Sequence, residues 1–137
     1  MKSFDSGSGT GAMALILIVD DDQYVRASLE NLLESVGYST QSAPSAEAFL
    51  ASYQVDRGDC LILDVRMKMM TGLELQRKLN AMGRRTPIIF LTAHCDDDTR
   101  ERALRGGASA FLCKPFKEDE LLAAIDRAVS GNLPPPE

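Results

Sequence analysis

The sequence is poor in several features that would point to particular protein classes. Its 137 residues include no tryptophan, one histidine and three cysteines without CxxC spacing. Histidine-driven catalysis would rest on His94 alone, and its neighbour Cys95 lies too close in sequence to face it productively on a loop. Because Cys60 and Cys113 lie inside apolar runs, we expect all three cysteines to be reduced, buried small hydrophobes of a cytoplasmic protein.

Long hydrophobic runs and excess positive charge are also absent. No apolar stretch approaches the roughly 20 residues that span a bilayer, and Lys2 is not followed by the apolar segment of a signal peptide. We therefore expect no membrane association. The net charge of −5, with a pI of about 4.9, argues against direct binding of nucleic acid through its phosphates.

The sequence does contain a regular alternation of apolar runs and amphipathic segments. Apolar runs predict strands at 14–19, 38–41, 60–63, 87–92 and 108–113, and the segments between and after them predict helices at 23–36, 44–53, 71–82, 96–105 and 118–129. Such alternation favours one α/β domain with a doubly wound, flavodoxin-like (βα)5 fold. We expect a five-stranded parallel sheet in the order 2-1-3-4-5.

The ends of the chain differ in composition from the middle. Residues 1–13 are rich in Ser and Gly, which predicts a flexible tail, either natural or a remnant of expression. We expect the folded domain to cover residues 14–131. Residues 132–137, with three consecutive prolines, then form a C-terminal tail or the start of a linker.

Polar residues follow four of the predicted strands at the point where each strand ends. Asp20-Asp21-Asp22 follows the first strand and Asp64 the third, while the fourth ends in Thr92 and the fifth runs into Lys114-Pro115. In a doubly wound sheet, ligands bind at the carboxyl edge beside the first strand. The predicted fold therefore brings these side chains to one site.

Carboxylates gathered at one edge repel each other, and a divalent cation relieves that repulsion. Oxygen ligands of this kind favour Mg²⁺. We expect Asp21 and Asp64 to bind it directly, Asp20 to act through a water, and the backbone carbonyl of Arg66 to supply another oxygen. Asp22 is better placed to cap the following helix.

Asp64 in such a site can act as a nucleophile toward a phosphoryl group and form an aspartyl phosphate. Lys114 would contact one phosphoryl oxygen and Thr92 would donate its hydroxyl hydrogen to another. A cis peptide before Pro115 would aim the lysine inward. Taken singly, Thr92 is as easily a strand-end hydroxyl bonded to backbone, and Lys114 a solvated amine.

The ordered set of motifs resembles the receiver domain of two-component response regulators over residues 14–131. The motifs are Val19-Asp20-Asp21-Asp22, Leu63-Asp64-Val65-Arg66-Met67, Thr71-Gly72-Leu73-Glu74-Leu75, Leu91-Thr92-Ala93-His94, Gly107-Ala108, Phe111 and Lys114-Pro115-Phe116. The resemblance implies a phosphorelay signalling switch. A sensor histidine kinase or phosphotransfer protein would phosphorylate Asp64, and the domain would catalyse only its own phosphorylation and dephosphorylation.

The resemblance also implies roles for residues around the acceptor. Thr92 and Phe111 would be the switch residues, and Arg66, Lys68 and His94 would tune hydrolysis. The surface of the fourth helix, fifth strand and fifth helix would then be read by an output partner or by a second copy in a homodimer. Without the resemblance, Phe111 is equally an ordinary core residue.

Two positions depart from the family pattern. Lys68 occupies the position, four residues after the acceptor, where the family usually has proline, so we expect a looser loop and an added positive charge. The switch position holds Phe111 rather than tyrosine, and phenylalanine has no hydroxyl with which to form a hydrogen bond.

Two other functions use a similar site. A Mg²⁺-dependent phosphatase or phosphotransferase of the haloacid-dehalogenase type would also use an aspartate nucleophile, but its Asp-x-Asp-x-Thr/Val motif is incomplete at Asp20-Asp21-Asp22-Gln23-Tyr24. A flavodoxin-like cofactor binder needs a phosphate-cradling loop after the first strand, where three aspartates would repel the anion.

Overall fold

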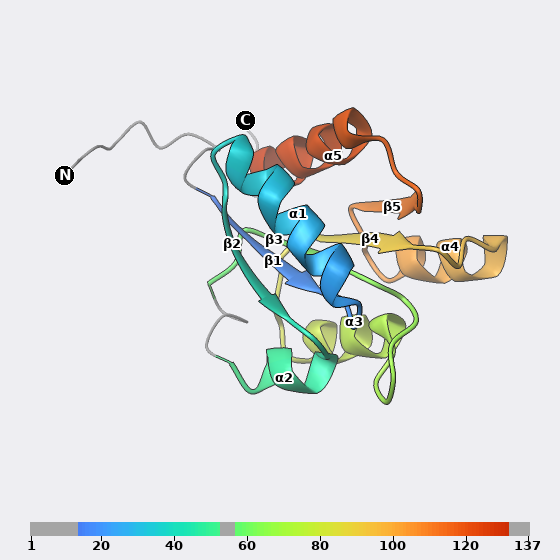
Figure 1. Ribbon diagram of the computed structural model, residues 1–137. Helices are drawn as coiled ribbons and strands as arrows, with labels where there is room; N and C mark the ends of the chain where they lie inside the picture. The colour runs from blue at the N-terminus through green and yellow to red at the C-terminus, as the bar shows by residue number, and fades with distance from the viewer. Residues whose placement is uncertain (1–13, 53–56, 132–137) are drawn as a thin grey trace, which may run out of the picture.

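The computed structural model describes residues 14–52 and 57–131, and it has the predicted architecture (Figure 1). Five parallel strands form one sheet in the order β2-β1-β3-β4-β5, which confirms the doubly wound fold. The elements are β1 Leu15–Val19, α1 Gln23–Ser35, β2 Ser39–Ala43, α2 Ala46–Leu50, β3 Cys60–Leu63, α3 Gly72–Ala81, β4 Ile88–Thr92, α4 Asp97–Arg105, β5 Ala110–Cys113 and α5 Glu118–Gly131.

Helices cover both faces of the sheet, so the core forms two layers (Figure 1). On one face, α1 and α5 bury Leu29, Leu33, Leu121 and Ile125 against the sheet. On the other face, α2, α3 and α4 contribute buried side chains that include Phe49, Leu75, Leu79 and Ala103. The three central strands are almost wholly buried, which explains why their sequences are apolar without alternation.

Side-chain caps start the helices close to where the sequence predicts. The Asp22 carboxylate accepts hydrogen bonds from the backbone N–H of Tyr24 and Val25, which confirms it as the N-cap of α1. Thr71 and Glu74 form the predicted capping box at the start of α3. After α1, Gly37 takes a positive φ of 103°, the backbone conformation that glycine adopts without strain.

Several predicted boundaries were wrong by two or three residues, among them the end of α5, which runs to Gly131 rather than to residue 129. β2 runs to Ala43 because it pairs with β1 up to Val19, although its own side chains are mostly exposed. Because the Ser45 hydroxyl caps the first turn, α2 starts at Ala46. The Ala108 N–H closes the end of α4 on Ala103, so β5 begins only at Ala110.

Some predictions concern residues outside the described ranges. Both tails, 1–13 and 132–137, fall there, so the domain boundaries stay predictions. The predicted end of the second helix at Tyr53 was wrong, because α2 already ends at Leu50, with Ala51 as its C-cap. Among residues 14–52 and 57–131, no helix combines the length and apolar character that crossing a membrane requires.

Candidate functional site

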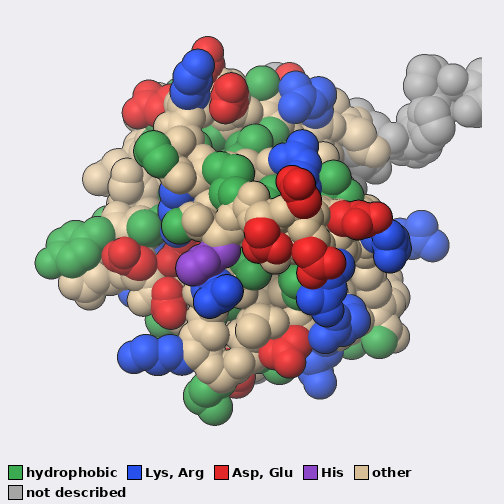
Figure 2. Space-filling view, turned by 90° about the vertical axis from the view of Figure 1, so that its right-hand side faces the viewer, with side chains coloured by type: hydrophobic (Ala, Val, Ile, Leu, Met, Phe, Trp, Pro, Cys, Tyr) green, Lys and Arg blue, Asp and Glu red, His purple; other side chains and the backbone are tan. Residues whose placement is uncertain are grey.

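The polar residues predicted at the strand ends do meet at the carboxyl edge of the sheet. β1 and β3 are neighbours in register, with Val19 beside Leu63, so Asp20 and Asp64 leave the sheet side by side. Thr92 ends β4, and Lys114 follows β5. Figure 2 shows this edge, with acidic side chains gathered near the single histidine.

Three carboxylates form the centre of the site. One carboxylate oxygen from each of Asp20, Asp21 and Asp64 lies within 4.8 Å of the other two. The side chains of Asp20 and Asp64 are buried, whereas Asp21 is exposed. An all-oxygen donor set of this kind fits a hard divalent cation such as Mg²⁺.

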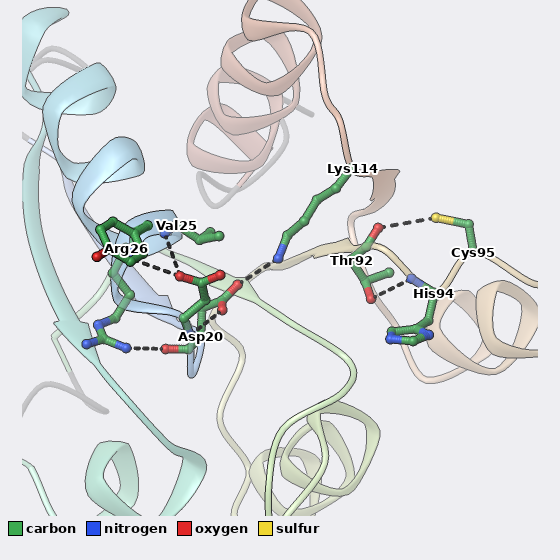
Figure 3. A network of polar contacts seen from close by, with 9 residues as sticks. Asp20, Val25, Arg26, Thr92, His94, Cys95 and Lys114 are labelled. Atoms are coloured by element: carbon green, nitrogen blue, oxygen red, sulfur yellow. Dashed lines mark hydrogen bonds and ion pairs between the residues drawn. The ribbon is translucent and has the colours of Figure 1, made fainter.

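Asp20 is held in place by several contacts. Its Oδ1 accepts a hydrogen bond from the Asp22 N–H at 2.9 Å, and its Oδ2 forms an ion pair with Lys114 Nζ at 3.0 Å (Figure 3). Arg26 Nη1 donates to the Asp20 backbone carbonyl at 2.7 Å. Because protein groups already contact both carboxylate oxygens, a water-mediated role of Asp20 toward a cation is consistent with the geometry.

Asp64 lies in an environment that opposes its negative charge. Burial raises the pKa of its carboxyl group, and the charge of Asp20 raises it further. The Lys114 ammonium, a hydrogen bond with the Thr92 side chain and a backbone hydrogen bond with Val65 act in the opposite direction on this pKa. A cation at the three carboxylates would therefore relieve a repulsion that the fold itself creates.

Lys114 and Thr92 approach the acids from β5 and β4. The peptide between Lys114 and Pro115 is cis, as predicted, and the lysine side chain extends toward Asp20 (Figure 3). Thr92 is completely buried, and its hydroxyl oxygen accepts a hydrogen bond from the His94 N–H at 3.1 Å. The Thr92 carbonyl oxygen accepts another from the Lys114 N–H at 2.8 Å, so the ends of β4 and β5 are joined.

Phe111 lies in the core beneath this edge. The residue is 5% exposed, and its ring packs at a tilt against Phe90, with 6.1 Å between ring centroids. The guanidinium of Arg100 on α4 lies 5.9 Å from the centroid of the same ring. This cation–π contact gives a hydroxyl-free residue a polar partner on the α4 side.

The three predicted tuning residues are exposed on loops around the site: Arg66 and Lys68 follow β3, and His94 follows β4. The loop with Lys68 in place of proline has its own restraints, since Glu47 Oε2 accepts a hydrogen bond from the Met70 N–H at 3.1 Å. Met69 in this loop takes a positive φ of 66° and is 83% exposed.

The prediction for the cysteines was wrong for two of the three. Cys60 is buried and free, as predicted, and burial raises the pKa of its thiol to about 12. Cys95 and Cys113 are exposed and joined by a disulfide. Their proximity depends on the pairing of Thr92 with Cys113 across β4 and β5, which spacing in the sequence does not reveal.

Sequence reasoning also missed two polar contacts that support the site. These are the hydrogen bond from Arg26 to the Asp20 carbonyl and the one from the Met70 N–H to Glu47. Neither Arg26 nor Glu47 belongs to a motif, and each side chain reaches its partner only because its helix packs beside the partner's loop. The one sequence signal for the Arg26 contact is its position in the first turn of α1, close to the carboxyl edge of the sheet.

Comparisons with known proteins agree with this geometry. The sequence profile of the response regulator receiver domain matches residues 16–126. The response regulator protein TodT of Pseudomonas putida is 43% identical over 116 residues, which cover 85% of this chain and 51% of TodT. The transcriptional regulatory protein FixJ of Azorhizobium caulinodans is 44% identical over 109 residues, covering 79% of this chain and 51% of FixJ.

Solved structures give the same assignment. The structure of FixJ-N superposes with a TM-score of 0.81 and 36% identity, covering 89% of this chain and 98% of FixJ-N. The chain spans about half the length of the curated relatives it matches. With the profile match, the shared fold and the cluster of acids, lysine and threonine at one sheet edge, this chain belongs to the response regulator receiver domain family of two-component systems.

Proposed function

We propose that the domain is a phosphorylation-dependent switch that accepts a phosphoryl group on Asp64 from a histidine kinase or a phosphotransfer protein. The observation that carries the proposal is the convergence of Asp20, Asp21, Asp64, Thr92 and Lys114 at one edge of the sheet. The proposed setting is the cytoplasm, and the proposed chemistry is limited to phosphorylation and dephosphorylation of Asp64 itself.

The residues suggest how transfer would proceed. A carboxylate oxygen of Asp64 attacks the phosphorus of the donor's phosphohistidine, and the bond from phosphorus to the imidazole nitrogen breaks. Mg²⁺ held by Asp21, Asp64 and the Arg66 carbonyl would neutralise charge on the phosphoryl oxygens. The phosphoryl oxygens then compete with Asp20 for the Lys114 ammonium, which lies 3.0 Å from Asp20 before transfer.

Thr92 links this chemistry to the rest of the fold. Its hydroxyl lies between Asp64 and the His94 N–H, so a phosphoryl group on Asp64 offers it a new, more strongly charged acceptor. We propose that the loop after β4 follows Thr92 and that Phe111 and Arg100 rearrange with it. The α4–β5–α5 surface would then be the face read by an output partner or a second copy of the domain.

The direct test is phosphorylation with a small donor. Acetyl phosphate and Mg²⁺ are expected to add one phosphoryl group that is stable in acid and labile in base, as an acyl phosphate is, and intact-protein mass spectrometry measures it. The same incubation with a chelator is the control. Repeated turnover of phosphate-ester substrates without a trapped phosphoprotein would support an aspartate-nucleophile phosphatase or phosphotransferase instead.

The metal assignment has a matched pair of variants. Asp21→Ala is expected to weaken Mg²⁺ binding by at least about 10–100-fold, the range measured even for residues that only support a ligand. Asp22→Ala should leave Mg²⁺ affinity little changed and cost about 1 kcal/mol of stability, because Asp22 caps α1. Calorimetric titration and denaturant unfolding measure the two quantities, and equal losses of affinity would contradict the ligand assignment.

A further inference from the structure

The Cys95–Cys113 disulfide lies next to the proposed switch residue. Cys95 is three residues after Thr92, in the loop between β4 and α4, and Cys113 is the last residue of β5. The two Cα atoms are 5.9 Å apart. Thr92 and Cys113 are also direct partners in the β4–β5 ladder, so the disulfide closes the loop after Thr92 onto the neighbouring strand.

The same loop contacts the Thr92 backbone and is hydrogen-bonded to the Thr92 side chain. The Sγ of Cys95 lies 3.3 Å from the Thr92 carbonyl oxygen (Figure 3). That oxygen accepts a hydrogen bond from the Lys114 N–H. The Thr92 hydroxyl oxygen accepts from the His94 N–H. A movement of Thr92 toward a phosphoryl group would therefore draw on residues 93–95, and the disulfide fixes the end of that segment.

Both sulfur-bearing residues are accessible to small molecules. Cys95 and Cys113 are exposed, whereas Cys60 is completely buried and burial raises the pKa of its thiol to about 12. Thiolates react and thiols do not, so Cys60 stays inert under conditions in which the exposed pair exchanges. The molecule thus contains one exposed pair of cysteines and one buried thiol.

We propose that reversible formation of the Cys95–Cys113 disulfide is a redox control on the phosphorylation switch, and that the oxidised form holds the β4–α4 loop in its unphosphorylated position. The inference rests on the proposed function, because it concerns the movement of Thr92 toward a phosphoryl group on Asp64. In the reduced form the loop is free to follow Thr92. In the oxidised form the disulfide opposes the loop movement that accompanies phosphorylation.

Small-molecule disulfides are the oxidants that fit this site. One cysteine thiolate attacks a sulfur of the small disulfide and expels a small thiolate, which leaves a mixed disulfide on the protein. The second cysteine thiolate attacks the protein sulfur of that mixed disulfide, forms the Cys95–Cys113 bond and expels the second small thiolate. Two protein thiols thereby lose two protons and two electrons, and the small disulfide becomes two small thiols. An excess of dithiol reverses the reaction.

Thermodynamic linkage predicts whether the disulfide strengthens or weakens the binding of a phosphoryl mimic. A tether that stabilises the unphosphorylated conformation must weaken the binding of any ligand that favours the phosphorylated one. By reciprocity, binding of that ligand disfavours formation of the disulfide by the same factor. Coupling of this kind between sites is typically about 5–150-fold in affinity. We expect the oxidised domain to bind a phosphoryl mimic about tenfold more weakly than the reduced domain.

The test uses beryllofluoride with Mg²⁺ as the phosphoryl mimic. The chain is prepared fully reduced with dithiothreitol or fully oxidised with oxidised glutathione, the redox state is verified by thiol-labelling mass spectrometry, and the apparent beryllofluoride affinity is measured by NMR titration. The expected result is tighter binding by the reduced form. Failure of glutathione disulfide to form the Cys95–Cys113 bond, or equal or tighter binding by the oxidised form, would overturn the proposal.

A double variant, Cys95→Ser with Cys113→Ser, is the matched control. It cannot form the tether, so its affinity should equal that of the reduced wild type under both redox conditions. A variant that still responds to glutathione disulfide would assign the effect elsewhere and overturn the proposal. If neither redox form of the wild type binds beryllofluoride, the proposed phosphorylation site itself is wrong, an outcome distinct from equal binding by both forms.

Discussion

An Asp64→Asn variant is expected to take up no phosphoryl group from acetyl phosphate in the presence of Mg²⁺. The amide lacks the anionic oxygen that attacks phosphorus and removes one of the three carboxylates of the cluster. Intact-protein mass spectrometry should show only unmodified chain under conditions that phosphorylate the wild type. Phosphorylation of the variant to the wild-type level would place the acceptor at another residue.

The same substitution is expected to stabilise the domain when Mg²⁺ is absent. Burial and Asp20 raise the pKa of Asp64 in the folded state above its usual value of 3.8. The unfolded state keeps the usual pKa of Asp64, and the folded state has the raised one. Between these two pKa values the folded state binds more protons than the unfolded state. The stability linked to Asp64 is therefore complete below the unfolded pKa and is lost as pH rises through the folded pKa. At pH 7 the wild type bears that loss and the variant does not.

Thermal unfolding as a function of pH measures this effect. The wild type without metal should lose stability relative to Asp64→Asn as pH rises above about 4, and Mg²⁺ should raise the midpoint of the wild type more than that of the variant. Asp22→Asn is the matched control, because asparagine caps a helix about as well as aspartate and Asp22 lies outside the cluster. A lower midpoint for Asp64→Asn at pH 7 would contradict the assigned cause of the pKa shift.

Gly72→Ala is expected to damage both the fold and the site. A Cβ atom at Gly72 would lie 2.1 Å from the backbone carbonyl oxygen of Asp64 and 3.0 Å from the Val65 Cα. The Gly72 N–H also donates to the Val65 carbonyl at 2.8 Å, which holds the start of α3 against the end of β3. An alanine at position 72 must push the start of α3 away from the backbone of Asp64 and Val65. Asp64 is the proposed phosphoryl acceptor, so the site is displaced as well.

We expect this variant to lose about 1–3 kcal/mol of stability, the usual cost of overpacking, and to be phosphorylated more slowly than the wild type. Denaturant unfolding and the acetyl phosphate assay measure the two effects. Gly131→Ala is the matched control, since a Cβ there meets nothing within 4 Å, and it should be neutral or slightly stabilising at the end of α5. A Gly72→Ala domain of wild-type stability and phosphorylation would show that the close approach is not required.

The contrast between the strand-end residues and the cysteines shows which parts of the site were predictable. Asp20, Asp64, Thr92 and Lys114 each follow or end an apolar run, and any parallel sheet brings such positions to one edge. The meeting of Cys95 with Cys113 has no comparable rule. It requires the β4–β5 register, the path of the intervening loop and the exposure of both residues together.

The strand boundaries also divide into those that the sequence predicts and those that depend on tertiary pairing. Buried strands such as β3 were predicted to the residue because their apolar runs match the burial of both faces. β2 was predicted short because it is an edge strand with mostly exposed polar side chains, and its last residue pairs only because β1 lies beside it. The sequence showed Lys68 in place of proline, but not that Glu47 accepts a hydrogen bond from the Met70 N–H in the same loop.

By itself, the sequence determined the (βα)5 order, the sheet topology and the identity of the acidic edge, because these follow from hydrophobic periodicity and from the short, right-handed connections of parallel strands. Only the tertiary structure decided which protein groups contact each acid, how deeply Asp64 is buried beside Asp20, and that two exposed cysteines close the loop after Thr92. Those features depend on distances between segments far apart in the chain, and local patterns carry no information about such distances until the elements have packed.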